Sequence, residues 1–280
     1  MDAYWLVIIV LIIIGVIVLK RSSWFSNDIP KTIWTYWDSP TLPESVQKCI
    51  QTWKTHNPDY DVVVLSDDKL SKYLPDVNIL GMKMANTPQR KSDFIRIHII
   101  EKYGGIWCDA SIMMNSSLDF VRQKSGCDFV GYHIGKMMNT PDSPVIENWF
   151  MAAPPGSNFI RKWKETFSKI NDFKDPSDYV NSIRDQGVDI SKVESPEYLT
   201  MHVASQHVIQ KQMSPDEVSN KLYLMKAEDG PLKYLADNYW NSAKGIESIC
   251  NTEYTHPIIK FRGTERELIE KRSKLKCVFD

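Results

Sequence analysis

The sequence lacks an excess of charge of either sign, and this excludes one broad class of function. Its 280 residues carry 34 Lys and Arg against 35 Asp and Glu, for a formal net charge of -1. Proteins that bind nucleic acid in general usually show a strong basic excess. We therefore expect no nucleic-acid partner. The sequence also lacks internal repeats and low-complexity tracts, and its length allows one large domain or two small ones.

Cysteine is sparse, and its spacing lacks any metal-binding pattern. The five cysteines are Cys49, Cys108, Cys127, Cys250 and Cys277, with no CxxC pair among them. An odd number without paired spacing argues against a structural zinc site or a disulfide framework. We expect buried free thiols in a reducing compartment.

One stretch lacks charge altogether. Tyr4 to Leu19 runs apolar, and as a helix it would span roughly 24 Å. This is slightly short of a hydrocarbon core of about 30 Å, a mismatch that bilayer thinning can absorb. We expect a transmembrane anchor. A cleaved signal peptide fits less well, because residues 1–3 contain no basic residue and no small-x-small site follows. A soluble core helix is the remaining alternative.

The flanking charges predict the orientation of this segment. Lys20 and Arg21 follow it and Asp2 precedes it, so the positive-inside rule places the following domain in the cytoplasm. A lumenal domain in the Golgi or the endoplasmic reticulum is the alternative. The predicted organisation is an anchor over 1–21, a linker over 22–29 and one catalytic domain over 30–280, in a single-pass membrane protein.

Apolar patterning after the linker predicts alternating strands and helices. We expect strands over 30–38, 60–66, 106–109, 129–133, 222–225 and 257–261, and helices over 43–54, 87–103, 158–169, 176–186, 196–211 and 264–274. This alternation indicates an α/β fold with a mostly parallel sheet.

The stretch from Gln89 to Met114 is the centre of the functional prediction. It combines an amphipathic helix, the break Gly104-Gly105, a short buried strand and Asp109 at the end of that strand. Open α/β sheets bind ligands at the carboxyl ends of their strands. A hard cation on Asp109, Mg²⁺ or Mn²⁺, could bridge it to a diphosphate, with Ser111 offering a hydroxyl. The alternative is that Asp109 caps a turn.

Two polar pairs elsewhere are candidates for the same site. Asp93 and Arg96 lie three residues apart on one helix face, where they could meet a ligand or form a surface ion pair. Glu147 and Asn148 interrupt an apolar run. Burying both without partners would cost several kcal/mol. A functional or hydrogen-bonded role is therefore favoured for this pair.

Aromatic and basic residues complete the set of candidates. Trp34, Tyr36 and Trp37 could stack on a nucleobase or could belong to the core. Near the C-terminus, His256 could ligate the metal and Lys260 could hold a phosphate.

Several of these motifs together resemble a known family. Ile29-Pro-Lys-Thr-Ile-Trp34, Lys91-Ser-Asp-Phe-Ile-Arg96 and Tyr103-Gly-Gly-Ile-Trp-Cys-Asp-Ala-Ser111 are similar to the capsular polysaccharide synthesis proteins and the related DXD-containing sugar transferases. The resemblance covers roughly residues 29–262. It extends to Glu147-Asn-Trp-Phe-Met-Ala-Ala-Pro154, Tyr198-Leu-Thr-Met-His202 and His256-Pro-Ile-Ile-Lys260.

The resemblance implies a GT-A (Rossmann-like) glycosyltransferase domain. By position, Asp93 and Arg96 would meet the nucleotide or donor sugar and Asp109 would be the first aspartate of the metal motif. With the candidates above, the predicted catalytic residues are Asp109, Glu147, Asn148 and Lys260; the predicted nucleotide-sugar-binding residues are Trp34, Tyr36, Trp37, Asp93, Arg96, Tyr103 and Gly105; and the predicted ligands of Mn²⁺ or Mg²⁺ are Asp109, Ser111 and His256. Ser111 stands where many relatives have a second aspartate, which makes metal dependence an open point.

The function implied is that of a membrane-anchored glycosyltransferase in polysaccharide biosynthesis. It would move a sugar from a nucleotide-sugar donor to a glycan or glycolipid acceptor, with retention of anomeric configuration and help from a divalent metal. A catalytically impaired, membrane-tethered scaffold that binds nucleotides or sugars is the alternative. A metal-dependent phosphohydrolase is a third reading, but such sites usually gather more Asp and His.

Overall fold

The computed structural model describes residues 28–124, 126–137, 142–252, 254–272 and 277–279. The predicted anchor over 1–21 and nearly all of the predicted linker over 22–29 lie outside these ranges.

The predicted membrane localisation is corrected, because it finds no support among the described residues. Across those ranges, no helix is long and apolar enough to cross a membrane. The physical reason is length and composition: helix α4 (Pro88–Tyr103) has 16 residues and includes Arg90, Lys91 and Asp93. A span of about 20 apolar residues is needed to cross a bilayer.

The core of the molecule is a six-stranded mixed sheet with the strand order β2-β1-β3-β6-β5-β7. These strands are β1 (Thr32–Tyr36), β2 (Asp61–Leu65), β3 (Gly105–Cys108), β5 (Phe129–His133), β6 (Ile146–Ala153) and β7 (Leu222–Lys226). Strand β6 runs antiparallel to both of its neighbours, and the other pairings are parallel. A separate two-stranded ladder joins β4 (Ile112–Met114) to β8 (Ile258–Lys260).

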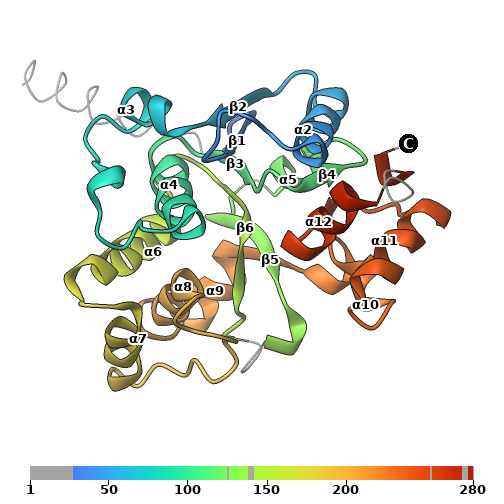
Figure 1. Cartoon of the computed structure of the whole chain (residues 1–280). Helices are drawn as coiled ribbons and strands as arrows, with labels where there is room; N and C mark the ends of the chain where they lie inside the picture. Colours follow the sequence, from blue (N-terminus) through green and yellow to red (C-terminus); the bar gives the residue numbers. More distant parts are fainter. Residues whose placement is uncertain (1–27, 125, 138–141, 253, 273–276, 280) are drawn as a thin grey trace, which may run out of the picture.

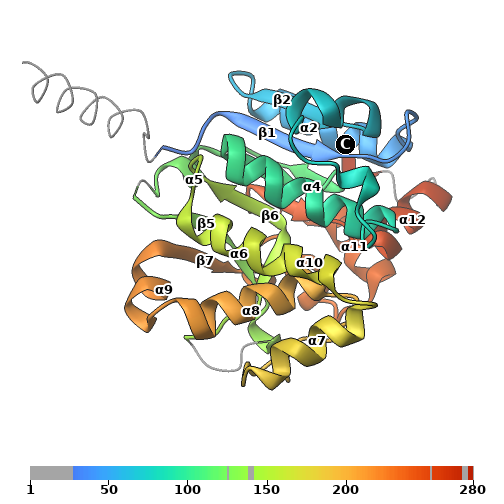
Figure 2. The same cartoon turned by 90° about the vertical axis from the view of Figure 1, so that its left-hand side faces the viewer.

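Helices cover both faces of the sheet, so the fold has three layers (Figure 1, Figure 2). One face packs against α4, α6 (Asn158–Ser168), α7 (Pro176–Asp185) and α8 (Thr200–Gln212), through one large apolar cluster. The other face packs against α2 (Glu44–His56), the β4–β8 ladder, α10 (Lys233–Ala236), α11 (Ser242–Asn251) and α12 (Gly263–Lys271), through a second cluster. Three short helices complete the set, namely α3 (Leu70–Tyr73), α5 (Asp119–Arg122) and α9 (Pro215–Lys221).

The predicted α/β fold and most of the predicted elements are confirmed, with several differences. Strand β6 and helices α10 and α11 were not predicted, and the sheet is mixed because β6 runs against its neighbours. Helix α8 begins at Thr200, four residues later than the predicted start at 196. Strand β4, which the sequence analysis did not predict, is only three residues long and follows a tight turn after Asp109.

The glycine pair after α4 is required by close packing. Gly104 and Gly105 have φ angles of 62° and 91°, in the left-handed region that favours glycine. A Cβ on Gly104 would lie 2.5 Å from the backbone nitrogen of Pro155, and one on Gly105 would lie 2.7 Å from the carbonyl oxygen of Thr32. The break lets the chain leave the helix and enter β3 directly, which places Asp109 at the far end of the sheet.

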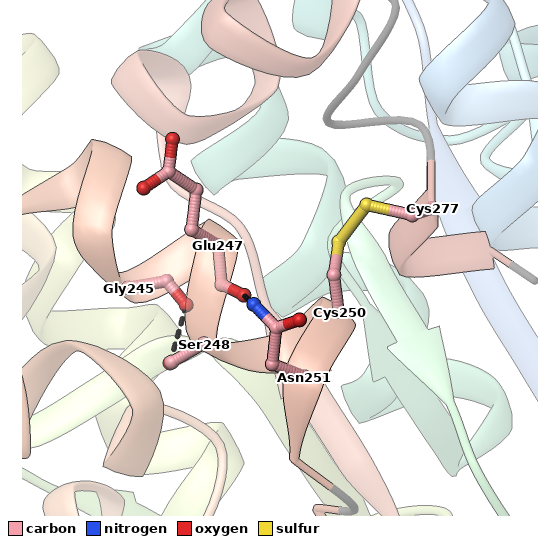
Figure 3. The surroundings of a disulfide bond; sticks show 6 residues. All are labelled: Gly245, Glu247, Ser248, Cys250, Asn251 and Cys277. Atoms are coloured by element: carbon pink, nitrogen blue, oxygen red, sulfur yellow. Dashed lines mark hydrogen bonds between the residues drawn. A yellow bond between two sulfur atoms is a disulfide. The ribbon is translucent and has the colours of Figure 1, made fainter.

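The cysteine prediction is wrong for two of the five residues. Cys250, at the end of α11, forms a disulfide with Cys277 near the C-terminus (Figure 3). Cys49 and Cys108 are free and buried, and Cys127 is free and partly buried. The pair is 27 residues apart in the chain, and connectivity across such a separation cannot be deduced from spacing alone. The disulfide also removes the argument for a reducing compartment.

Candidate active site

The candidate site lies at one edge of the main sheet, where chemically distinct side chains converge from four elements. The parallel strands β1, β2 and β3 all end at this edge. Because β6 is antiparallel, its first residues return to the same place: Phe150 pairs with Cys108, and Ile146 pairs with His133. This topology brings Glu147 and Asn148 next to Asp109, although nearly forty positions separate them in the chain.

Asp109 is the centre of the cluster, and nitrogen donors surround its carboxylate. Lys260 Nζ donates to Oδ2 at 2.8 Å, and Trp107 Nε1 donates to Oδ1 at 3.1 Å. The Arg96 guanidinium lies 3.3 Å from Oδ1. Burial alone would raise the pKa of Asp109, but the Lys260 ammonium and then the Arg96 guanidinium outweigh it and hold that pKa below its usual value. Asp109 is therefore ionised at neutral pH.

Helix α4 presents Arg96 to this carboxylate and holds it in place. The Arg96 side chain is buried, yet its guanidinium donates to the Asn148 carbonyl oxygen at 2.7 Å and to Ser92 Oγ at 3.0 Å. Its planar head lies over the Trp107 ring, 5.2 Å from the centroid. A guanidinium with several partners is well positioned, which suits it to recognise an anionic oxygen.

Asp93 is the second carboxylate of the cluster. It lies 3.4 Å from the Arg96 guanidinium, and its Oδ1 accepts a hydrogen bond from Asn148 Nδ2 at 2.9 Å. Burial raises the pKa of Asp93 above its ordinary value, even though Arg96 and then His202 act in the opposite direction. The buried amide of Asn148 thus has the partners that the sequence analysis required of it.

Glu147 meets a histidine that the sequence analysis did not assign to the site. The carboxylate Oε2 of Glu147 lies 3.7 Å from His202 Nε2, and both side chains are buried. The other ring nitrogen of His202, Nδ1, is buried without a hydrogen-bond partner in the described structure. An unpaired buried polar atom costs free energy, and in native proteins it often marks a functional position. The pair can hold or move a proton.

A second polar network lies at the same edge, at the ends of β1 and β2. The Tyr36 hydroxyl donates to Asp67 Oδ1 at 2.6 Å, and Lys91 Nζ donates to Asp67 Oδ2 at 2.8 Å. Burial alone would raise the pKa of Asp67. The hydrogen bonds from Lys91 and Tyr36 outweigh this effect and hold the pKa below its usual value, so the carboxylate stays ionised. This network gives the edge a second set of groups for a polar ligand.

Four of the predicted nucleotide-binding residues, Trp34, Trp37, Tyr103 and Gly105, do not contact this cluster. Gly105 begins β3, at the end of that strand opposite to Asp109. Trp34 is buried there and donates through Nε1 to the Gly104 carbonyl at 3.0 Å. Its ring packs with that of Tyr103, with centroids 5.5 Å apart. Trp34, Tyr103 and Gly105 thus form part of the core. Trp37 lies at the correct edge, but its ring packs under the Arg266 guanidinium at 5.0 Å.

His256 lies just before the β4–β8 ladder. Strand β8 pairs Lys260 with Ile112 and Ile258 with Met114, so His256 lies beyond the end of this ladder that is farther from Lys260. The His256 ring contacts the neighbouring backbone, with Nδ1 3.0 Å from the Ile258 carbonyl oxygen. Its role as a metal ligand with Asp109 and Ser111 stays a prediction.

The remaining donor set does not fit a divalent metal. The described residues contain no group of three or more His, Cys, Asp or Glu side chains that could hold an ion. Asp109 Oδ2 and Ser111 Oγ, the two donors a metal would use, both accept hydrogen bonds from Lys260. Mg²⁺ and Mn²⁺ favour near-octahedral sets of oxygen ligands. Here a cationic side chain stands in their place.

Several residues of the site were not assigned from the sequence. Trp107 and Ser92 position the Asp109 and Arg96 side chains. Tyr198 is 61% exposed, and its pKa is raised by partial burial and then by the charges of Asp93 and Asp109. The stretch from Tyr198 to His202 resembles the family, and this was the available signal for both residues.

A family model described as "Capsular polysaccharide synthesis protein" matches residues 17–261. Two curated relatives are similar to half of the chain. The O-glycosyltransferase braB of Annulohypoxylon truncatum is 29% identical over 162 residues, which cover 51% of this chain and 38% of that protein. The glycosyltransferase afumC of Aspergillus fumigatus is 26% identical over 159 residues, which cover 51% and 41%. The chain therefore spans less than half the length of these relatives.

Among solved structures, one similar chain is a glycosyltransferase involved in the glycosylation of the major capsid of PBCV-1. The superposition covers 86% of this chain and 98% of that one, with a TM-score of 0.45 and 9% sequence identity.

Proposed function

The chain belongs to the capsular polysaccharide synthesis protein family, and on this premise we propose that it is a glycosyltransferase of the GT-A type. It takes a sugar from a nucleotide-sugar donor and transfers it to a hydroxyl group of a glycan or glycolipid. The donor lies along the carboxyl edge of the sheet, with its nucleotide toward Tyr36 and Asp67 and its diphosphate toward Asp109.

The observation that carries this proposal is the position of two buried cations on one strand-end carboxylate. Lys260 and Arg96 both lie within 3.5 Å of Asp109, at the edge where α/β sheets bind ligands. Arg96 also contacts Asp93, so its charge is shared between two carboxylates. The Lys260 ammonium has two hydrogen-bond partners among the described residues, Asp109 and Ser111, and its third N–H is available to an anionic ligand such as a diphosphate.

The residues present can support each part of a sugar transfer. The bond between the anomeric carbon and the diphosphate oxygen breaks, and the electron pair leaves with the nucleoside diphosphate, whose charge Lys260 and Arg96 stabilise. The acceptor oxygen forms the new bond to the anomeric carbon. Its proton passes to Glu147, whose carboxylate lies 3.7 Å from His202 Nε2. Asn148 and Asp93 orient the sugar.

Dependence on Mn²⁺ or Mg²⁺ is not part of this proposal, because the donor set around Asp109 does not fit a metal. Retention of anomeric configuration stays a prediction from the family resemblance. The anomer of the first-formed sugar product, observed by proton NMR, reports it.

The proposal is tested by hydrolysis and transfer assays with a panel of nucleotide sugars. We expect the 280-residue chain to release nucleoside diphosphate from at least one donor. In Asp109→Asn, the carboxylate that holds Lys260 and Arg96 in position is lost. We therefore expect turnover to fall by at least about 100-fold, the scale seen when one preorganised charge-stabilising group is lost from an active site.

A matched control is Asp119→Asn, which removes a carboxylate that accepts a hydrogen bond from Tyr60 at 2.9 Å, outside the cluster. It should keep its turnover. Near-normal turnover in Asp109→Asn would contradict the site assignment. Tight binding of a donor without any turnover would favour the scaffold reading instead.

A further inference from the structure

The Lys260 ammonium lies between Asp109 and Ser111, the two residues that align with the metal motif of the family. Its Nζ lies 2.8 Å from Asp109 Oδ2 and 3.0 Å from Ser111 Oγ. A divalent ion bound by a carboxylate and a residue two positions later would occupy this same space. The ammonium therefore stands where such an ion would bind, and it contacts the same two oxygen atoms.

The backbone around Lys260 fixes the ammonium in that place. The Lys260 amide donates to the Pro231 carbonyl at 3.0 Å, and its carbonyl accepts from the Tyr234 hydroxyl at 2.9 Å. The next amide, that of Phe261, donates to the Ser111 carbonyl at 3.0 Å. The Lys260 side chain is only 9% exposed, so its stem is packed and its head has little freedom to turn toward water.

The charges around the position disfavour an additional cation. Lys260 and Arg96 offset Asp109 and Asp93, so the cluster is already balanced. An ion next to the Lys260 ammonium would meet a like charge in a partly buried site, where charges interact more strongly than in water. To bind, it would first have to displace that ammonium from both oxygens.

We infer that Lys260 replaces the divalent metal of the donor site, so that this chain binds the diphosphate of its donor without a metal ion. The inference rests on the proposed function and specifies how its site works. An ammonium has three N–H donors. Two are directed to Asp109 and Ser111, and the third has no partner within the described residues. That third donor is available to a phosphate oxygen, beside the guanidinium of Arg96.

The test is a calorimetric titration of the 280-residue chain with UDP, GDP, dTDP and ADP, in EDTA and again in MnCl₂. We expect at least one nucleotide to bind, with dissociation constants in the two buffers that agree within about threefold. Binding at least tenfold tighter in MnCl₂ would overturn the inference and leave the proposed function standing. No binding of any nucleotide in either buffer would overturn the proposed function itself.

A variant sharpens the result. Lys260→Met keeps an unbranched side chain of nearly the same length and removes its charge. In EDTA it should bind the nucleotide at least tenfold more weakly. MnCl₂ should then recover part of the affinity, because Asp109 Oδ2 and Ser111 Oγ become free for an ion. Wild-type affinity of Lys260→Met in EDTA would contradict the inference.

The matched control is Lys164→Met. Lys164 is also partly buried and lies 3.1 Å from a carboxylate, that of Glu101, at the end of α4 away from the site. It should bind nucleotide as the wild type does in both buffers. Circular dichroism of each variant shows whether it is folded. If Lys260→Met is not folded, the titration of the wild type alone decides the inference.

Discussion

Lys260 and Arg262 are two residues apart on the same segment, yet their ion pairs differ in kind. Arg262 forms a closed pair with Glu265 at the start of α12: Nε donates to Oε2 at 2.9 Å and Nη2 donates to Oε1 at 2.8 Å. The same carboxylate accepts from the Arg262 amide at 2.9 Å. Arg262 thus contacts both oxygens of the fully buried Glu265, in the bidentate geometry that suits arginine, and Ser242 is a further hydrogen-bond partner of this carboxylate.

The Lys260 pair is open where the Arg262 pair is closed. Asp109 is shared between Lys260, Arg96 and Trp107, and its side chain is 26% exposed. Two cations converge on this partly exposed carboxylate, and one of them, Arg96, also contacts Asp93. The comparison teaches that a fully buried carboxylate closed by one arginine in bidentate geometry stabilises the fold, whereas a partly exposed carboxylate shared by two cations is arranged for a ligand.

The largest expected effect is a loss of stability when the closed pair between Arg262 and Glu265 is broken. Glu265→Gln leaves Arg262 without its counter-charge, but Arg262 is 41% exposed and can turn toward water. We therefore expect a loss of about 1–3 kcal/mol in the free energy of unfolding, less than the 3–5 kcal/mol typical of a fully buried pair. Urea unfolding measures it. Nucleotide affinity of the folded variant should be unchanged, and a parallel loss of affinity would show that the two pairs are coupled.

A smaller effect is expected on the pH dependence of stability. Burial alone would raise the pKa of Glu265. The hydrogen bonds from Arg262 and Ser242 and the charge of Arg262 together outweigh burial, so the pKa of Glu265 in the folded state is lowered. A lowered carboxyl pKa gives stability that is present above the unfolded value of about 4.3 and is lost as pH falls through the folded value.

Urea unfolding of the wild type between pH 7 and pH 3 should therefore show a fall in stability below about pH 4.3. The slope should be shallower in Glu265→Gln, which has no proton to bind at that position. Identical slopes for the two proteins would mean that the Glu265 pair does not carry this part of the acid sensitivity.

The smallest effect is expected at His256, which precedes the same strand and lies beyond its far end. His256→Gln should change nucleotide affinity by less than about twofold, in EDTA and in MnCl₂ alike, because its ring contacts the Ile258 backbone and lies against Gly230. Calorimetry measures this. A tenfold loss specific to MnCl₂ would restore His256 as a metal ligand and undermine the contrast between Lys260 and Arg262.

The parts of this account that follow local rules were predictable from the sequence. Apolar periodicity predicted the helix from Pro88 to Tyr103, and the glycine pair after it predicted the turn that places Asp109 at a strand end. The motif resemblance added the family. These signals depend on residues within a few turns of one another in the chain.

The parts that depend on distant pairing were not predictable. Lys260 meets Asp109 across 151 residues, through a β4–β8 ladder whose first strand is only three residues long. The antiparallel direction of β6, which brings Glu147 to His202, leaves no trace in its apolar pattern. A single sequence indicated which residues are unusual, but the topology decided which of them meet.

The most direct test of the central claim is a crystal structure of the chain with the nucleoside diphosphate that binds most tightly, grown in EDTA. The account predicts a diphosphate oxygen within about 3.2 Å of Lys260 Nζ, the usual limit for such a hydrogen bond, with Arg96 beside it. A diphosphate bound elsewhere on the molecule, or density at this edge that forms only when Mn²⁺ is added, would contradict it.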